Sequence, residues 1–114
     1  MPAEDAVILI TSKGMGHGPE ELQLTLLNKY LQLLELNGRL PTAICFYTEA
    51  VKLVAEASPI LDRLIALEQK GVRLIVCSTC LDYYGLSDKV KTGIAGSMAD
   101  IIEAQCNAKK VITI

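Results

Sequence analysis

The stretch that decides the fold is residues 71–80, which read Gly-Val-Arg-Leu-Ile-Val-Cys-Ser-Thr-Cys. Its middle part, 72–77, is a mostly apolar run that predicts a buried strand ending at Cys77. The residues from Ser78 onward predict a helix or turn, which Gly85 breaks. Because the apolar residues do not alternate with polar ones, the run is typical of a strand covered on both faces, as in a parallel sheet.

Further apolar runs of this kind occur at 6–10, 42–47 and 111–114, and helical patterns separate them. The expected strands are these runs, 72–77 and a further candidate at 89–93, and the expected helical segments are 19–36, 49–54, 58–70 and 97–106. Such alternation indicates an α/β fold with a mainly parallel sheet between helices. We therefore expect one domain, residues 1–114, built as a three-layer α/β/α sandwich in the style of flavodoxin.

The predicted helix 19–36 has more apolar surface than one packed face requires. Its apolar residues form two neighbouring stripes, Leu24, Leu27, Leu31 and Leu34 in one and Leu22, Leu26, Tyr30 and Leu33 in the other. A surface helix of a monomer usually has a single stripe. We therefore expect a second subunit to cover part of this helix, which makes the protein a homo-oligomer.

Composition excludes several classes of protein. Of the 114 residues, 51% are hydrophobic and the net charge is −2, as in a globular domain with no basic surface for nucleic acid. The first residues are acidic where a signal peptide would be basic, and no apolar run approaches the ~20 residues of a membrane span. With four cysteines and no export signal, we expect a cytoplasmic protein with reduced thiols.

Cys77 and Cys80 are the strongest candidates for chemistry. A thiol reacts as its thiolate, which backbone N–H groups and a second thiol nearby can stabilise. The alternative is that Cys77 is simply the last apolar residue of its strand. A Cys-x-x-Cys pair can also be half of a zinc site, but the chain has one histidine and no second such pair, so we expect no metal and no cofactor. We expect Cys45 and Cys106 to be core or surface residues.

Other candidate binding residues follow from the topology. Ligands of parallel sheets bind beyond the carboxyl ends of the strands, which places three loops at one edge. The first loop is glycine-rich, and its backbone either approaches an anion or forms a tight turn; it matches neither the dinucleotide nor the phosphate-loop pattern. Its histidine is either a proton donor or a solvent-facing side chain. The candidate binding residues are Gly14, Met15, Gly16, His17, Tyr47, Thr48, Ser78 and Thr79.

Residues 71–86 closely resemble the signature of the DsrE/DsrF-like sulfur-handling proteins, and most closely that of the C-terminal domain of the YedF-type selenium-metabolism proteins. Met15-Gly16-His17-Gly18 before a leucine-rich helix, Phe46-Tyr47, Val51-Lys52-Leu53 and Ser97-Met98 are also similar to that subgroup. The resemblance covers essentially the whole chain.

This resemblance implies a five-stranded parallel sheet, oligomers such as a dimer, trimer or hexamer, and a role as a sulfurtransferase or sulfur carrier. In related proteins a cysteine eight residues before a glycine carries a persulfide, and Cys77 and Gly85 match that spacing. Cys80 matches the additional cysteine of the subgroup. The resemblance thus predicts sulfane sulfur, or selenium, on Cys77, with donor and acceptor proteins acting in trans.

The chain departs from the subgroup around the predicted pocket. It has Ser78 where glycine is usual, Thr48-Glu49-Ala50 before Val-Lys-Leu, and Ser97 where asparagine is usual. Two other functions therefore stand beside sulfur relay. One is a non-catalytic oligomeric binding or scaffold module, and the other is a thiol-disulfide redox protein that uses the Cys-x-x-Cys pair.

Overall fold

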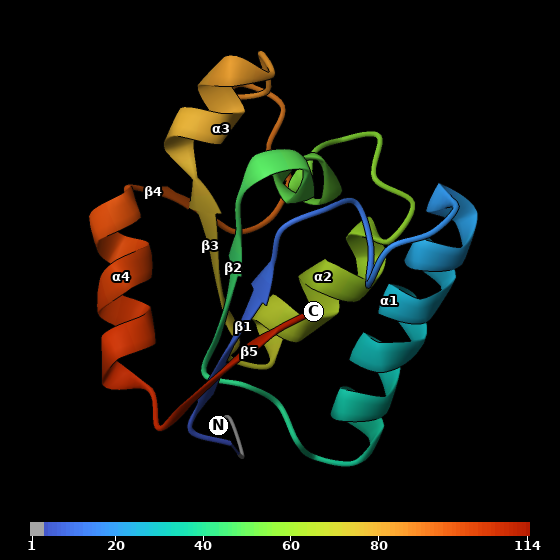
Figure 1. Ribbon diagram of the computed structural model, residues 1–114, viewed down its shortest axis with the longest axis vertical. Helices are drawn as coiled ribbons and strands as arrows, with labels where there is room; N and C mark the ends of the chain where they lie inside the picture. The colour runs from blue at the N-terminus through green and yellow to red at the C-terminus, as the bar shows by residue number, and fades with distance from the viewer. Residues whose placement is uncertain (1–3) are drawn as a thin grey trace.

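A computed structural model describes residues 4–114 and shows a single five-stranded sheet with helices around it (Figure 1). All strand pairs are parallel, and the strand order is β4-β3-β2-β1-β5. The elements are β1 (Ala6–Ile10), α1 (Glu20–Leu36), β2 (Ala43–Phe46), the 3₁₀ helix η1 (Thr48–Val54), α2 (Leu61–Gln69), β3 (Arg73–Cys77), α3 (Ser78–Tyr83), β4 (Ile94–Gly96), α4 (Met98–Asn107) and β5 (Lys110–Thr113).

The helices lie on both faces of the sheet. Figure 1 shows α1 and α2 on one side and α4 on the other, while α3 and η1 lie beyond the carboxyl ends of the strands. Strands β1 to β4 step across the sheet in one direction, so their crossovers α1 and α2 share a face. The return from β4 to β5 crosses the opposite face through α4. The predicted α/β/α sandwich with a five-stranded parallel sheet is therefore confirmed.

The inner strands explain the continuous apolar runs. Every residue of β1 and β2 is buried, and four of the five residues of β3 are buried. A strand with helices packed on both faces has no solvent-facing side, so alternation with polar residues disappears. The core is aliphatic, with Phe46 as its one fully buried aromatic side chain among residues 4–114.

Helix α1 shows both predicted stripes. Leu27 and Leu31 of the first stripe are fully buried against the sheet, whereas Leu22, Leu26 and Leu33 of the second stripe are 42–50% exposed. Tyr30, the fourth residue of the second stripe, packs against the core. The exposed leucines therefore have no partner within the described part of the chain. None of the helices in residues 4–114 is long and apolar enough to cross a bilayer.

The prediction of a strand at 89–93 is wrong, because β4 lies at Ile94–Gly96. Val90 forms only an isolated antiparallel bridge with Ala55. Gly93 has a φ of +82°, and its N–H donates to the Glu68 carboxylate at 3.1 Å, so this segment turns before it reaches the sheet. The true β4 is a three-residue edge strand whose residues are mostly exposed, which leaves little apolar signal.

Capping residues predict the starts of two helices, and one of these two predictions is confirmed while the other is wrong. Ser97 and Asp100 form the expected capping box at the start of α4. The prediction that α2 begins at Pro59 is wrong, because its first residue is Leu61. Ser58 Oγ instead accepts the N–H of Ile60 at 3.3 Å, so it stabilises the turn before the helix.

Candidate functional site

Three neighbouring strands end at the edge of the sheet where the cysteines lie. Ile10 of β1 pairs with Phe46 of β2, which in turn pairs with Val76 of β3. The residues that follow these strands, starting with Thr11, Tyr47 and Cys77, are therefore adjacent although they are far apart in the sequence. This edge is the one predicted from the strand pattern.

The two cysteines of the pair have different environments. Cys77 ends β3, precedes the first residue of α3 and is only 2% exposed. Cys80 lies in the first turn of α3, and its side chain is partly exposed. Burial, and then the hydrogen bond of the Cys80 thiol with Cys77, raise the pKa of Cys80. Cys77 is thus a close enough neighbour to influence the Cys80 thiol.

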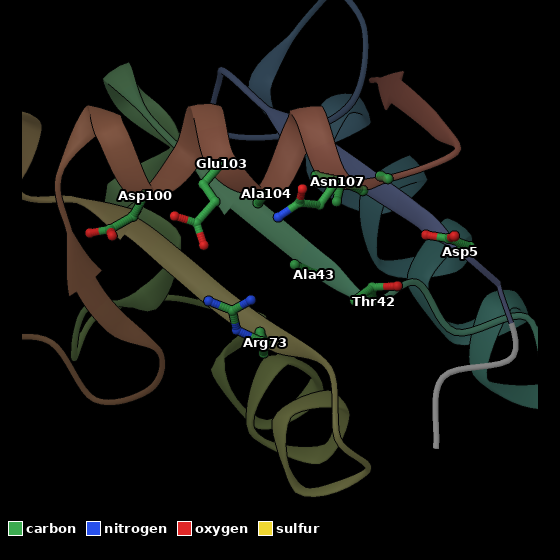
Figure 2. Close-up of a pocket in the computed structure, with 10 residues that line it drawn as sticks. Asp5, Thr42, Ala43, Arg73, Asp100, Glu103, Ala104 and Asn107 are labelled. Atoms are coloured by element: carbon green, nitrogen blue, oxygen red, sulfur yellow. The ribbon is translucent and has the colours of Figure 1, made fainter.

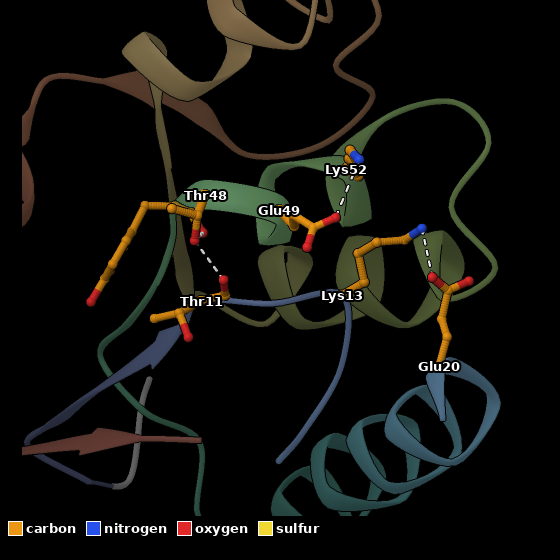
Figure 3. Close-up of polar contacts among 7 residues, drawn as sticks. Thr11, Lys13, Glu20, Thr48, Glu49 and Lys52 are labelled. Atoms are coloured by element: carbon orange, nitrogen blue, oxygen red, sulfur yellow. Dashed lines mark hydrogen bonds and ion pairs between the residues drawn. The ribbon is translucent and has the colours of Figure 1, made fainter. Parts of the chain in front are cut away.

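A third residue, Thr48, joins the cysteine pair through its backbone. Its N–H donates to Cys80 Sγ at 3.1 Å, and this bond acts on the pKa of Cys80 in the opposite direction to burial. The Thr48 hydroxyl donates to the carbonyl of Thr11 at 2.5 Å, which ties η1 to the end of β1 (Figure 3). Sequence reasoning named Thr48 but missed Thr11, whose position just after β1 was the available signal.

Thr48 also holds a strained backbone conformation. Its φ is +53°, and it is the one residue other than glycine with a positive φ among residues 4–114. A β-branched residue in this region costs about 1–3 kcal/mol, and such strain persists where the surrounding structure fixes it. Here the fixing contacts are those to Thr11 and Cys80, so the strain orients an N–H group toward a sulfur.

An open cleft of about 500 Å³ lies between η1 and the start of α1, and Thr48, Cys77 and Cys80 are not among its lining residues. Tyr84 lines it and lies one helical turn after Cys80 on the same side of α3. The Lys52 ammonium lies 4.4 Å from the centre of the Tyr84 ring. The complete lining is Lys13, Glu20, Leu24, Lys52, Leu53, Ala55, Ala57, Ser58, Pro59, Tyr84 and Leu86.

The cleft has charged side chains at its rim and aliphatic side chains inside. Figure 3 shows two ion pairs there, Lys13 with Glu20 at 2.7 Å and Lys52 with Glu49 at 3.5 Å. The hydrogen bond to Glu20 raises the pKa of Lys13. A pocket of this size with an apolar interior and a few charges suits a small organic molecule. Sequence reasoning missed the cleft, because its residues come from three segments that only the fold brings together.

The glycine-rich loop packs against α1. Met15 N–H donates to the carbonyl of Gln23 at 3.0 Å, and Gln23 Nε2 donates to the carbonyl of Gly16 at 2.6 Å. A Cβ atom on Gly14 would lie 2.4 Å from the backbone carbon of Gln23, so the close approach itself requires glycine. These hydrogen bonds join the predicted loop to a helix rather than to the cysteine pair. His17 is exposed in this loop.

The remaining candidate residues flank the site. Tyr47 is half-buried, and its N–H donates to the carbonyl of Ile10 at 3.2 Å. Ser78 is half-buried and Thr79 is exposed in the first turn of α3. Outside the site, Cys45 is fully buried, which raises its pKa to about 11, and Cys106 is exposed on α4, as expected for core and surface residues.

A second hollow lies at the opposite end of the sheet. It measures about 90 Å³ and lies between α4 and the amino ends of the strands. Figure 2 shows Arg73 pointing toward α4, where Asp100 and Glu103 are its acidic neighbours. Arg73 starts β3 and Cys77 ends it, so this hollow is remote from the thiols. Within residues 4–114, no three His, Cys, Asp or Glu side chains converge as a metal site would require.

Comparison with solved structures gives fold neighbours that span nearly the whole chain. The ychN protein from E. coli superposes with a TM-score of 0.70 at 22% identity, covering 97% of this chain and 99% of its own. MTH1491 from Methanobacterium thermoautotrophicum, a protein of unknown function, gives 0.73 at 19%, with 96% and 97% covered. BT1422 from Bacteroides thetaiotaomicron, also of unknown function, gives 0.70 at 18%, with 100% and 98% covered.

Comparison by sequence points to the same fold. A search of curated proteins gave no match. The sequence profile of the DsrE/DsrF-like family, however, matches residues 5–114, which is nearly the whole chain and includes both cysteines of the site. The expected family is thereby confirmed, and this chain belongs to the DsrE/DsrF-like family.

Proposed function

We propose that this protein is a sulfur-relay protein that holds sulfane sulfur as a persulfide on Cys77, with Cys80 assisting. Membership of the DsrE/DsrF-like family suggests sulfur relay at the level of the family. The observation that supports the proposal most is the placement of two free thiols, three residues apart, at the carboxyl edge of the sheet. This edge is where parallel α/β folds bind their ligands.

The chemistry of such a relay needs only thiols. A cysteine thiolate attacks the outer sulfur of a persulfide R–S–SH, a new S–S bond forms to the cysteine, and R–S⁻ leaves and takes a proton. The reverse step passes the sulfur to an acceptor thiolate. No net oxidation occurs, because one S–S bond forms while another breaks. The reaction therefore requires neither a metal nor an organic cofactor.

The proposal includes partners. Donor and acceptor proteins would act in trans, and a second copy of this chain would cover the exposed leucine stripe of α1. Burial of apolar side chains at about 25 cal/mol per Å² is the physical reason for this contact. Selenium is the alternative cargo, since a cysteine thiolate can attack the selenium of a selenopersulfide R–S–SeH by the same exchange, with R–S⁻ leaving and taking a proton.

Intact-protein mass spectrometry tests the proposal. The reduced protein is mixed with glutathione persulfide, and a parallel sample is mixed with a selenium donor. We expect the wild type to gain one sulfur atom, the Cys77→Ser/Cys80→Ser double variant to gain none, and the matched Cys106→Ser control to behave as the wild type. Absence of any gain in the wild type, or an equal gain in the double variant, contradicts the proposal.

Thiol-disulfide redox chemistry is a second candidate function, and the Cys-x-x-Cys spacing of two free thiols at the start of α3 favours it. An oxidant would take two electrons from the pair as two protons leave and an S–S bond forms. The same experiment separates the candidates, because a disulfide lowers the mass of the wild type by two hydrogen atoms. If the wild type neither gains sulfur nor forms the disulfide, the remaining candidate function is a non-catalytic binding module.

A further inference from the structure

We propose that Cys80 is the first acceptor of sulfur and that Cys77 receives it from Cys80, an order that rests on the proposed function. The family pattern alone points to Cys77, since that residue matches the spacing of the persulfide cysteine. The structure separates the two thiols by access and by hydrogen bonding. These differences assign them successive roles.

Access is the first argument. Cys77 is 2% exposed at the end of β3, whereas Cys80 is partly exposed one turn further on. Thiol exchange requires the attacking sulfur, the attacked sulfur and the leaving sulfur to approach in a line, so the donor must reach the thiol closely. A donor larger than a few atoms meets Cys80 before it meets Cys77.

The polar contact to Cys80 is the second argument. The N–H of Thr48 donates to Cys80 Sγ at 3.1 Å, and it belongs to a residue with a φ of +53°. The hydrogen bond from the Thr48 hydroxyl to the carbonyl of Thr11, which follows β1, fixes this strained conformation. An N–H aimed at a sulfur stabilises the negative charge of the attacking thiolate or of a persulfide on that sulfur.

The cleft that Tyr84 lines is the third argument, and it indicates the class of donor. Tyr84 connects the two features, because it follows Cys80 by one helical turn and lines the cleft. Leu24, Leu53 and Leu86 form an aliphatic surface, and the ammonium of Lys52 lies at the rim. This combination suits the organic part of a small persulfide.

The transfer has two balanced steps. The Cys80 thiolate first attacks the outer sulfur of the donor, which forms a Cys80 persulfide and releases the donor thiol. The Cys77 thiolate then attacks the outer sulfur of that persulfide, which places the sulfur on Cys77 and returns Cys80 to a thiol. Because Cys77 is buried, the sulfur ends where bulk reductants reach it poorly.

The first test uses the wild type alone. Iodoacetamide is added to the reduced protein, and the alkylation rate of each cysteine is followed by peptide mapping. The exposed Cys106 and the buried Cys45 serve as internal references. We expect Cys80 to react at least about tenfold faster than Cys77, since exposure controls access to the reagent. Equal rates for the two, or a faster Cys77, would overturn the inference.

The second test follows sulfur loading from glutathione persulfide in single variants. We expect Cys80→Ser to load at least about tenfold more slowly than the wild type. Cys77→Ser should still gain one sulfur, on Cys80, but should lose it faster than the wild type to dithiothreitol, because the sulfur stays on the more exposed thiol. Resistance of Cys45 to alkylation confirms that each variant is folded.

The outcomes separate this inference from the proposed function. If the wild type gains no sulfur, the proposed function fails and the order fails with it. If the wild type and Cys80→Ser load at the same rate while Cys77→Ser does not load, sulfur relay stands and the order is wrong. Loading from inorganic trisulfide, a donor smaller than glutathione persulfide, tests the argument from access. Because a small donor reaches the buried Cys77 more easily, the difference in loading rate between Cys80→Ser and the wild type should be smaller with trisulfide, and an equal difference would contradict the argument.

Discussion

Replacement of Gly14 by alanine should destabilise the protein far more than an ordinary glycine substitution. The new Cβ atom would lie 2.4 Å from the backbone carbon and 2.6 Å from the carbonyl oxygen of Gln23, where no flexible side chain can give way. The loop must therefore move off α1. That movement breaks the two hydrogen bonds that Gln23 makes to the loop, each worth about 0.5–1.5 kcal/mol. Overpacking adds about 1–3 kcal/mol, for a total near 2–6 kcal/mol.

Equilibrium unfolding in urea measures this cost. Circular dichroism is the suitable signal, because the chain has no tryptophan. Gly38→Ala is the matched control: Gly38 has a φ of +66° but no atom within 4 Å of its added Cβ. The control should lose only the ~1–2 kcal/mol of a left-handed backbone. If Gly14→Ala costs no more than Gly38→Ala, the loop does not pack on α1 as described.

Three further predictions concern the site, the surface and the core. Thr48→Gly removes both the strain and the hydroxyl contact, so the unfolding free energy in urea should change by less than about 1 kcal/mol. Sulfur loading, however, should slow severalfold, and an unchanged loading rate would show that the N–H contact is unimportant. The double substitution Leu26→Glu/Leu33→Glu should give monomers in analytical ultracentrifugation, whereas the control Gln32→Glu should sediment as the wild type; a wild type that is itself monomeric would refute the interface on α1. Burial raises the pKa of Cys45 to about 11, so the folded state binds this proton more tightly than the unfolded chain. Its contribution to stability is complete below pH 9 and is lost toward pH 11, a change of about 2–3 kcal/mol that should be absent in Cys45→Ala. Parallel pH profiles for the two proteins would contradict this.

Most of the fold could be predicted because its central strands have a strong local signal. The runs at β1, β2 and β3 are apolar throughout since helices cover both faces, and glycine or capping residues mark the helix ends. The edge strand β4 has three mostly exposed residues and no such signal. The nearby segment 89–93 has a single apolar side chain, Val90, between two lysines, and its bridge to Ala55 is a tertiary contact that the local sequence does not encode.

The sequence could predict which residues lie at the candidate site, but not how deeply they are buried or which backbone conformation they adopt. The Cys-x-x-Cys spacing and the rule that ligands bind at the carboxyl edge located the cysteines and Thr48. The unequal burial of Cys77 and Cys80 could not be inferred, because it depends on packing of β3 and α3 with their neighbours. The positive φ of Thr48 was also hidden, since this conformation is favoured by glycine and appears here only because Thr11 holds it.

The bond from Thr48 N–H to Cys80 Sγ joins residues that are 32 positions apart in the chain. Because Thr48 follows β2 and Cys80 follows β3, this bond requires the ends of the two paired strands to be adjacent. The alkylation rate of Cys80 therefore reports when this edge of the sheet has assembled. Short pulses of alkylating reagent at successive times during refolding would measure when the ends of β2 and β3 come together. This readout is useful because the chain has no tryptophan whose fluorescence could be followed.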